Sequence, residues 1–436
     1  MSVAKRWGPY TQMSSLATTG PIVIDRAEGI YVWDESGRRY LDAHAGLWLS
    51  NIGYGRSEII QAVTQQAQKL SWFSSFGGFA NRPSLMLAEK LVHLLEPDGM
   101  GSVFFSNDGS EAVETALKIS RQFWKVRSRA QKYKLIGRQH AYHGVTFGAL
   151  SVAGITANRQ GFEPLLTGVL HAPAPYANHC AFHAAGTQCT LACAREVERI
   201  IQCEGPDSVA AFIAEPIQAA GGVIIPPPEY LRQVREICRR YEVLFIADEV
   251  VTGFGRLGDW TGSRHYGIQP DLMTFAKGIT SGYLPLGATA VAPHVMEAFL
   301  QSSQDGPELR HGNTYSGHPL AAVAALANIA VIETEQLVSR AAKMGDYLHS
   351  QLDQIARQYP NLVVDANCVG LLGRVELFPS SDGPGKTAAA VAKHLLDHGI
   401  IVRPVGDVIT LSPPLIIGES EIDTIVDTLA SALTAQ

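Results

Sequence analysis

The stretch VLFIADEVVTGFGR, residues 243–256, constrains the fold of this chain more than any other segment. It opens with five apolar residues in succession, and strands that are apolar on both faces belong to the middle of a parallel sheet. Two carboxylates, Asp248 and Glu249, follow at the end of the strand. Open α/β sheets bind ligands in the crevice beyond the carboxyl ends of their strands. We therefore expect Asp248 to face a ligand that is positively charged where it meets the acid.

Short apolar strands alternate with helical stretches over much of the chain. Further strands are expected at SVFFS, KYKLIG, AAFIAEP and DLMTFAKG, with helical connections such as YLRQVREICRRY. This alternation predicts an α/β fold whose central sheet is mostly parallel and is covered by helices on both faces.

The length of the chain predicts more than one domain. A chain of 436 residues is too long for one small core, and we expect two or three structural units. Residues 1–57, with a β-meander over 21–43, are predicted to join a small domain. Residues 58–325 hold the strand–helix alternation and form the large domain. Residues 326–436 carry helices and a few strands, and they predict a smaller C-terminal α+β domain.

Composition excludes several classes of protein. The net charge of −6 and the pI near 6.2 argue against nucleic acid or an anionic membrane as a partner. The first twenty residues lack the apolar core of a signal peptide. The apolar stretch that starts at Pro319 is interrupted by Asn328 and is too short to span a bilayer, so it predicts a buried helix. We expect a cytoplasmic protein with small-molecule partners.

The six cysteines include no C-x-x-C pair, and we expect free thiols in a reducing compartment. The stretch HCAFHAAGTQCTLAC, residues 179–193, groups two histidines and three cysteines. Its spacing matches no common zinc finger or ribbon. We expect a loop there and no metal site.

An apolar strand that ends in Asp-Glu also resembles the magnesium-binding strand of P-loop NTPases. That hypothesis requires a G-x-x-x-x-G-K-[ST] loop to hold phosphates. The only candidate is SSDGPGKT, residues 380–387, which has Ser380 where the first glycine must stand and lies far downstream of the sheet. The sequence therefore disfavours this alternative.

Lys277 in TFAKG ends another apolar strand, so it and Asp248 could border one crevice. A solvated charge at the end of a strand is the simpler interpretation. A desolvated lysine, however, can form a Schiff base with an aldehyde, because burial and neighbouring cations lower its pKa. Pyridoxal phosphate requires such an amine, a carboxylate for its pyridinium nitrogen and a polar cradle for its phosphate.

A candidate cradle lies in SNDGSEAVETALK, where Gly109 and Ser110 stand between the strand SVFFS and a helix. Free N–H groups and the helix dipole make such a start an anion site. Asp108 and Glu111 also form a fair capping box, so simple capping stays an alternative. Tyr142 in HAYHG could stack on a cofactor ring, although packing is the commoner role of a loop aromatic.

Six segments now carry a family resemblance: SNDGSEAVETALK, HAYHG, FIAEP, FIADEVVTGFGRLG, PDLMTFAKGITSGYLPLGA and HGNTYSGHPLA. Their order and spacing resemble the class III aminotransferases, which are fold type I pyridoxal-phosphate enzymes. The resemblance covers nearly the whole chain, and the aspartate and lysine strands are its most specific part. The segments LDAHAGLWLSNIGYG and IIVRPVGDVITLSPPL look most like the ω-transaminases, which act on ω-amino acids or amines with pyruvate.

The resemblance implies roles toward pyridoxal 5′-phosphate. Lys277 would be the Schiff-base lysine, and Asp248 would hold the pyridinium nitrogen. Gly109 and Ser110 would bind the phosphate, and Tyr142 would stack on the ring.

Five further roles follow from the same resemblance. Glu215 would lie beside the polar substituents of the ring, and Thr314 would reach the phosphate of the neighbouring subunit. Trp48, together with Phe79, would line the substrate pocket. Arg403 would receive a substrate carboxylate.

Asp108 departs from the family pattern, which has a small polar residue before Gly109. An extra negative charge would weaken phosphate binding unless the side chain caps the helix and points away.

The implied reaction is transamination with ping-pong kinetics, in which Lys277 acts as general base once an incoming amine has displaced it. The amino group would pass from an amine or ω-amino acid to a keto acid, expected to be pyruvate, with 2-oxoglutarate left open. Aminomutases, racemases and decarboxylases of the same fold keep this lysine and aspartate, so the two residues do not name the reaction. A homodimer is implied, with a tetramer left open.

Overall fold

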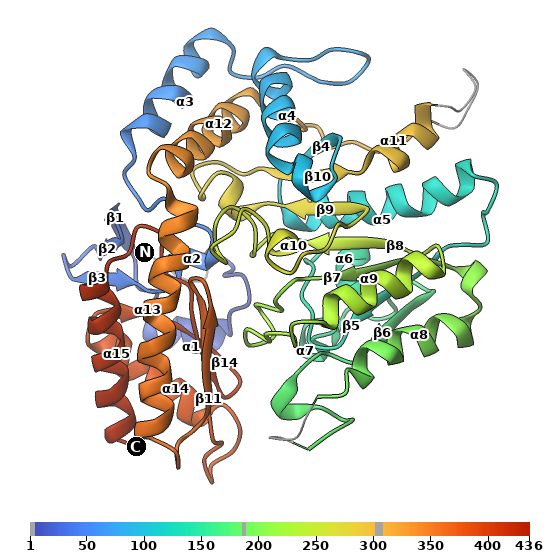
Figure 1. Ribbon diagram of the computed structural model, residues 1–436. Coiled ribbons are helices and arrows are strands. Elements are labelled where there is room, and N and C mark those ends of the chain that lie inside the picture. Colours follow the sequence, from blue (N-terminus) through green and yellow to red (C-terminus); the bar gives the residue numbers. More distant parts are fainter. Residues whose placement is uncertain (1–4, 185–188, 301–307) are drawn as a thin grey trace.

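The computed structural model describes residues 5–184, 189–300 and 308–436. A seven-stranded central sheet lies at its centre, with strand order β4-β10-β9-β8-β7-β5-β6 (Figure 1). The strands are β4 Ser102–Ser106, β10 Gly287–Val291, β9 Leu272–Phe275, β8 Leu244–Asp248, β7 Val209–Ala214, β5 Lys134–Arg138 and β6 Val169–Ala172. From β6 to β9 all neighbours pair in parallel, whereas β10 is antiparallel to both β9 and β4. The predicted α/β fold with a mostly parallel sheet is confirmed.

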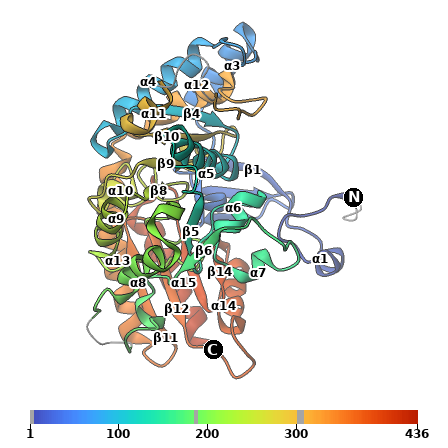
Figure 2. The same ribbon diagram turned by 90° about the vertical axis from the view of Figure 1, so that its right-hand side faces the viewer.

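Apolar side chains on both faces of β7 and β8 bury two separate cores. Phe212 and Phe245 belong to the core beneath α8 (Ala192–Glu204) and α9 (Tyr230–Arg240), while Ile213 and Ile246 belong to the core beneath α5 (Gly109–Val126) and α6 (Phe147–Val152). Successive side chains of a strand point to opposite faces, so helices on both sides require strands without a polar face. Figure 2 shows α9 and α6 on opposite sides of the sheet.

Two smaller sheets lie beside the central one. The first contains β11 Val363–Val369, β12 Leu372–Leu377, β15 Val408–Leu411 and β14 Arg403–Val405, and it packs with α13 Leu337–Gln358 and α14 Lys386–Asp397, next to α15 Glu419–Thr434. The second contains β1 Ile24–Glu28, β2 Tyr31–Asp34, β3 Arg39–Asp42 and β13 Ile400–Ile401. Because β13 pairs in parallel with β3, the N-terminal meander and the C-terminal part share one sheet. This pairing supports the proposed joining of residues 1–57 to the small domain.

The remaining elements are helices and 3₁₀ turns, and among them α12 is largely buried. The other helices are α1 Met13–Thr19, α2 Ala45–Trp48, α3 Ser57–Lys69, α4 Arg82–Leu95, α7 Thr156–Arg159, α10 Gly262–His265, α11 Pro293–Leu300 and α12 Pro319–Thr334. Single 3₁₀ turns occur at η2 Glu96–Asp98, η3 Ala177–His179, η4 Pro206–Ser208 and η5 Lys277–Ile279. In the part of the chain that is described, no single helix is long and apolar enough to cross a membrane. The bent pair α12 and α13 meets that test by length and composition alone.

The apolar helix α12 carries one buried amide, Asn328, which holds the turn after Lys277. Its Nδ2 donates to the carbonyl oxygens of Gly278 at 2.9 Å and Ile279 at 3.0 Å, and its Oδ1 accepts from Ser281 Oγ at 2.6 Å. A buried amide that uses both ends in this way is satisfied and directional. The residue that interrupts the apolar run therefore fixes the segment that presents Lys277.

Two details of the expected sheet need correction. The strands β6 and β10 were not foreseen, because each is a short apolar run without a charged residue at its end. Lys277 does not end β9, which stops at Phe275; it opens η5 with a left-handed φ of 47°. The lysine thereby leaves the line of the strand and turns toward the neighbouring β8.

Candidate active site

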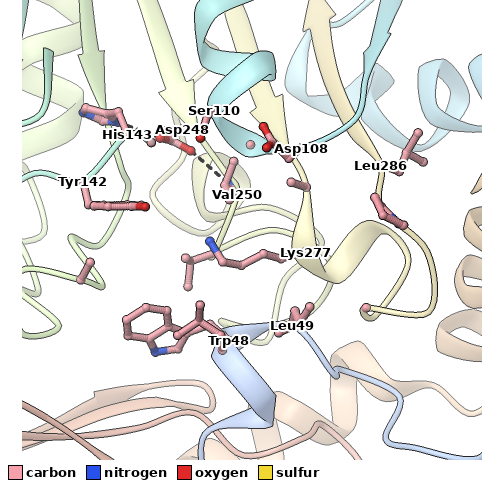
Figure 3. Close-up of a pocket in the computed structure, with 18 of the residues that line it drawn as sticks. Trp48, Leu49, Asp108, Ser110, Tyr142, His143, Asp248, Val250, Lys277 and Leu286 are labelled. Carbon is pink, nitrogen blue, oxygen red and sulfur yellow. Dashed lines mark hydrogen bonds and ion pairs between the residues drawn. The ribbon is translucent and has the colours of Figure 1, made fainter. Parts of the chain in front are cut away.

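A pocket of about 420 Å³ opens at the carboxyl ends of the central strands. Figure 3 shows Lys277 reaching into it, with Asp248 and Tyr142 on one side and Trp48 below. Of the residues singled out in the sequence, its lining contains Trp48, Asp108, Gly109, Ser110, Tyr142, Glu215, Asp248 and Lys277. Segments that follow β4, β5, β7, β8 and β9 thus meet at one edge of the sheet, as expected for an open α/β fold.

Lys277 is a half-buried amine that lines the pocket. Burial lowers the pKa of its ammonium group, and the nearby carboxyls of Asp248 and Glu215 act in the opposite direction. Desolvation penalises the charged form of a lysine, so the neutral, nucleophilic form becomes accessible at lower pH than in water. The interpretation of Lys277 as a solvated charge at the end of a strand is wrong.

Asp248 is held rigidly at the end of β8. Its Oδ2 lies 2.7 Å from Nδ1 of His143, and its Oδ1 accepts from the backbone N–H of Val250 at 3.1 Å and from Thr274 Oγ1 at 3.2 Å. The carboxylate is only 4% exposed. A buried acid that is fixed by three partners and faces the pocket suits a cationic group of a bound ligand.

The first turn of α5 forms a polar cup. The N–H groups of Gly109 and Ser110 lie in this turn, where an α-helix supplies no acceptor of its own. Ser110 Oγ accepts from the N–H of Val145 at 3.2 Å. A Cβ on Gly144, whose φ is +128°, would lie 2.7 Å from Ser110 Oγ. Only glycine allows the HAYHG loop to approach the cup so closely.

Asp108 caps α5, since its side chain accepts from the N–H of Glu111 at 2.8 Å. The carboxylate of Glu111 does not close the predicted capping box, because it accepts instead from the backbone and side chain of Asn107 at 2.8 and 2.9 Å. The negative charge of Asp108 is thus engaged at the helix start, which is the condition under which it would not oppose phosphate.

Glu215 fixes the loop that carries Tyr142. Its carboxylate accepts from the N–H of Tyr142 at 3.0 Å and from that of Ala219 at 3.1 Å. Burial raises the pKa of Glu215 to about 7. The hydroxyl of Tyr142 meets that of Tyr10 from the N-terminal segment, and burial is the main cause that raises the pKa of Tyr142.

Trp48 lines the pocket and contacts Arg403, which is not itself part of the lining. The guanidinium carbon of Arg403 lies 5.2 Å from the centre of the Trp48 ring, a cation–π distance. His44 packs edge-on against the same indole at 4.6 Å. Burial, and then the charges of Arg403, Arg256 and Lys277, lower the pKa of His44 to about 3, so its ring is neutral.

Three predicted site residues are absent from the pocket lining of the single chain: Arg403, which contacts Trp48, and the residues Phe79 and Thr314. Phe79 is 61% exposed and packs edge-on against Phe73 at 5.4 Å. Thr314 is exposed beside Tyr315, outside the pocket lining. Both lie on surface segments, and their predicted roles rest on the family resemblance.

Sequence reasoning missed several residues of the pocket. His143 stands in HAYHG next to Tyr142, and a histidine between an aromatic and a glycine gave no independent signal. Tyr10, which lies outside the lining and contacts Tyr142, belongs to a segment without periodicity. The apolar wall of Leu47, Leu49, Leu284 and Leu286 was not foreseen, because leucines in loops are usually explained by packing.

The cysteine–histidine stretch shows no metal-binding geometry in its described part. Over residues 5–184, 189–300 and 308–436, no group of three or more His, Cys, Asp or Glu side chains could hold a metal ion. The six cysteines are free thiols.

The comparisons with known proteins agree with this site. The sequence profile of the family described as aminotransferase class-III matches residues 13–433. The putrescine–pyruvate aminotransferase of Pseudomonas aeruginosa is 41% identical over 425 residues, covering 96% of this chain and 91% of that protein. The diaminobutyrate–2-oxoglutarate transaminase of Halomonas elongata is 40% identical over 418 residues, covering 93% and 88%.

A solved structure gives the same result. The ω transaminase from Pseudomonas jessenii, in complex with PMP, superimposes with a TM-score of 0.95 and 38% identity, covering 100% of this chain and 97% of that one. The chain belongs to the class III aminotransferases. It is a transaminase of fold type I that depends on pyridoxal 5′-phosphate, and the P-loop NTPase hypothesis is wrong.

The residues of this pocket fit that cofactor. A buried amine of lowered pKa can react with its aldehyde, a fixed carboxylate can pair with its ring nitrogen, and the open N–H groups of a helix start can bind its phosphate. In this chain those groups are Lys277, Asp248, and Gly109 with Ser110, and all of them line one pocket.

Glu215 makes the stability of the cofactor-free protein depend on pH. The pKa of its carboxyl is raised to about 7 in the native state from 4.5 in the unfolded chain, so between these values the native state holds the proton. The free energy of unfolding should therefore fall as pH rises through this window and level off above it. Denaturant titrations of the wild type and of Glu215→Gln measure this effect. The free energy of unfolding of the wild type, minus that of Glu215→Gln, should decrease by about 2–3 kcal/mol between pH 5 and pH 8. Parallel pH profiles for the two proteins would contradict this assignment.

Proposed function

We propose that this transaminase moves the amino group of an amine or ω-amino acid to pyruvate in the pocket around Lys277, with ping-pong kinetics. The observation that carries the proposal is the half-buried Lys277 amine, whose pKa is lowered by burial and which shares one pocket with Asp248. The neutral form of an amine is the form that can accept a proton and return it.

Each residue then has a defined task. When bound, pyridoxal 5′-phosphate supplies the aldehyde and the electron-accepting ring that the reaction needs. Asp248 would pair with the ring nitrogen of the cofactor through a charge-assisted hydrogen bond, and His143 and Thr274 hold Asp248 in place. Lys277 Nζ would accept the proton from the amine-bearing carbon of the substrate and later return it.

Substrate recognition is proposed to use the side of the pocket that Trp48 forms, together with the neighbouring Arg403. Trp48 and the leucine wall present apolar surface to the substituent of the amine. Arg403 offers a guanidinium fork to the carboxylate of the keto acid, and a bidentate contact of this kind discriminates carboxylates from apolar groups. The relative named for putrescine and pyruvate supports the amine donor and the pyruvate acceptor. The relative named for 2-oxoglutarate makes that keto acid the competing acceptor to assay.

The cytoplasm is the proposed location. All six cysteines are free, including the buried Cys193, Cys238 and Cys368, which is typical of proteins in a reducing compartment.

The central test is turnover with an amine donor and pyruvate. Wild-type protein loaded with cofactor should form alanine, whereas Lys277→Ala should bind the cofactor without turning over. Lys134→Met is a matched control, because Lys134 pairs with Glu204 outside the pocket, and it should keep wild-type turnover. Steady turnover by Lys277→Ala without added amine would overturn the role of this lysine.

Arg403→Ala should separate the two half-reactions. Removing the guanidinium should weaken the half-reaction with pyruvate by roughly 2–4 kcal/mol, the value of a charge-assisted bidentate contact. The half-reaction with a carboxylate-free amine should change little, and stopped-flow measurement of each half distinguishes them. Arg39→Ala, which removes another arginine stacked on an aromatic ring, serves as the control. Equal losses in both halves would mean that Arg403 is structural.

A homodimer is proposed to complete the site. Five exposed aromatic residues flank Thr314 or lie in the segment before α4: Trp72, Phe73, Phe76, Phe79 and Tyr315. Trp72 and Tyr315 contact each other at 6.0 Å, so the two segments are neighbours. If a second copy covered this apolar surface, Thr314 of the first copy would reach the polar cup at the start of α5 in the second copy.

Light scattering on the cofactor-loaded protein should give the mass of a dimer, and Tyr315→Glu should shift the protein toward monomer with loss of cofactor affinity. A fully active monomer would contradict the shared site.

A further inference from the structure

The stretch between β3 and α3 has an uncommon backbone conformation. Ala45, Gly46 and Trp48 have φ values of 46°, 67° and 60°. Residues other than glycine rarely adopt this left-handed region, and a tryptophan there is strained. Strain of this kind persists only where surrounding contacts hold it, and it is concentrated at functional sites.

Asp42, the last residue of β3, supplies those contacts. Its Oδ1 accepts from the N–H of His44 at 3.0 Å, and its Oδ2 accepts from the N–H of Gly46 at 2.6 Å and from the hydroxyl of Tyr54 at 2.6 Å. The carboxylate is 2% exposed. Burial, together with the adjacent carboxylate, raises the pKa of Tyr54, so its hydroxyl stays protonated and donates. One buried acid thus receives three donors from a single loop.

The far end of the same stretch is fixed independently. Asn51 donates from Nδ2 to the carbonyl of Phe254 at 2.8 Å, and its Oδ1 accepts from Nη2 of the buried Arg256 at 2.7 Å. The strained residues lie between the two anchors, and Asp42 is the anchor that contacts the N–H of one of them, Gly46, directly.

The consequence of this geometry is the position of Trp48. The backbone N–H of Trp48 donates to the carbonyl of His44 at 2.9 Å, so the indole follows the turn that Asp42 holds. The ring is 4% exposed, lines the pocket and lies under the guanidinium of Arg403. A shift of residues 44–46 would therefore move the wall of the pocket.

We propose that Asp42 is a positioning residue for this reaction: its carboxylate holds residues 44–46 in the conformation that places Trp48 in the pocket, and it thereby sets the affinity for the apolar substituent of the amine donor. The proposal rests on the substrate-facing role of Trp48 under the proposed function. Asp42 touches neither substrate nor cofactor in this arrangement, and it acts through the tryptophan.

The test is a comparison of KM and kcat for Asp42→Asn. The amide has the size of the carboxylate, but its NH₂ group faces a donor N–H, so at least one contact to the loop is lost. The KM for an arylalkylamine should rise roughly tenfold, whereas the KM for pyruvate and the absorption band of the bound cofactor should change by less than about threefold. Tyr54→Phe, which removes one donor and no charge, should give a smaller shift in the same direction, and it replaces Asp42→Asn if that variant does not fold.

Two controls separate positioning from stability. Asp98 is also buried and accepts from Thr261 Oγ1 at 2.8 Å and from Arg264 Nη2 at 2.6 Å, outside the pocket. Asp98→Asn should lower the melting temperature and leave both KM values unchanged. In a Trp48→Ala background, Asp42→Asn should have no further effect on the KM of the amine, because its route to the substrate is gone.

The proposal is overturned if Asp42→Asn leaves the KM of the amine unchanged, raises both KM values equally, or acts undiminished in the Trp48→Ala background. Failure of the proposed function would give a different result: either the wild type does not transaminate, or Trp48→Ala alone leaves the KM of the amine unchanged.

Discussion

The desolvation of Lys277 is the constraint on which the rest of this structure depends. An ammonium group taken out of water loses solvation, so the pKa of Lys277 is lowered and its neutral amine becomes accessible at lower pH than in water. The fold creates that environment by placing the lysine after a fully buried strand and turning it back through a left-handed residue. Asn328 on α12 stabilises the turn that follows Lys277, because both ends of its amide form hydrogen bonds with that turn.

The two carboxylates at the end of β8 have opposite tasks. Glu249 points away from the pocket and accepts from the N–H groups of Gly262 at 2.8 Å and Ser263 at 2.6 Å, with Thr252 as a further donor. It is absent from the pocket lining and ties the loop after β8 to the start of α10. Asp248 faces the pocket and presents its carboxylate to the ligand. Adjacent residues of a strand point to opposite sides, which explains why one acid serves the reaction and the next serves the fold.

Much of the site could be predicted because its residues lie in compact motifs at the ends of strands. Lys277, Asp248 and Ser110 each follow an apolar run, so the rule that ligands bind at carboxyl ends places them together. The antiparallel strand β10 could not be predicted, since a short apolar run has no direction. Tyr10 and the leucine wall also stayed hidden, because their positions depend on loop conformations that only tertiary packing determines. The expected effect of Asp108 depended on where its side chain points, and the structure shows it engaged with the helix start.

The most direct measurement is chemical trapping of the cofactor on the protein. Cofactor-loaded enzyme would be reduced with borohydride, digested and analysed by mass spectrometry for the residue that carries the cofactor. Lys277, with its pKa lowered by burial and with Asp248 in the same pocket, predicts the added mass on the peptide that contains Lys277, and no added mass in Lys277→Ala. Recovery of the cofactor on another lysine, such as the buried Lys132, would contradict the assignment of this pocket as the active site.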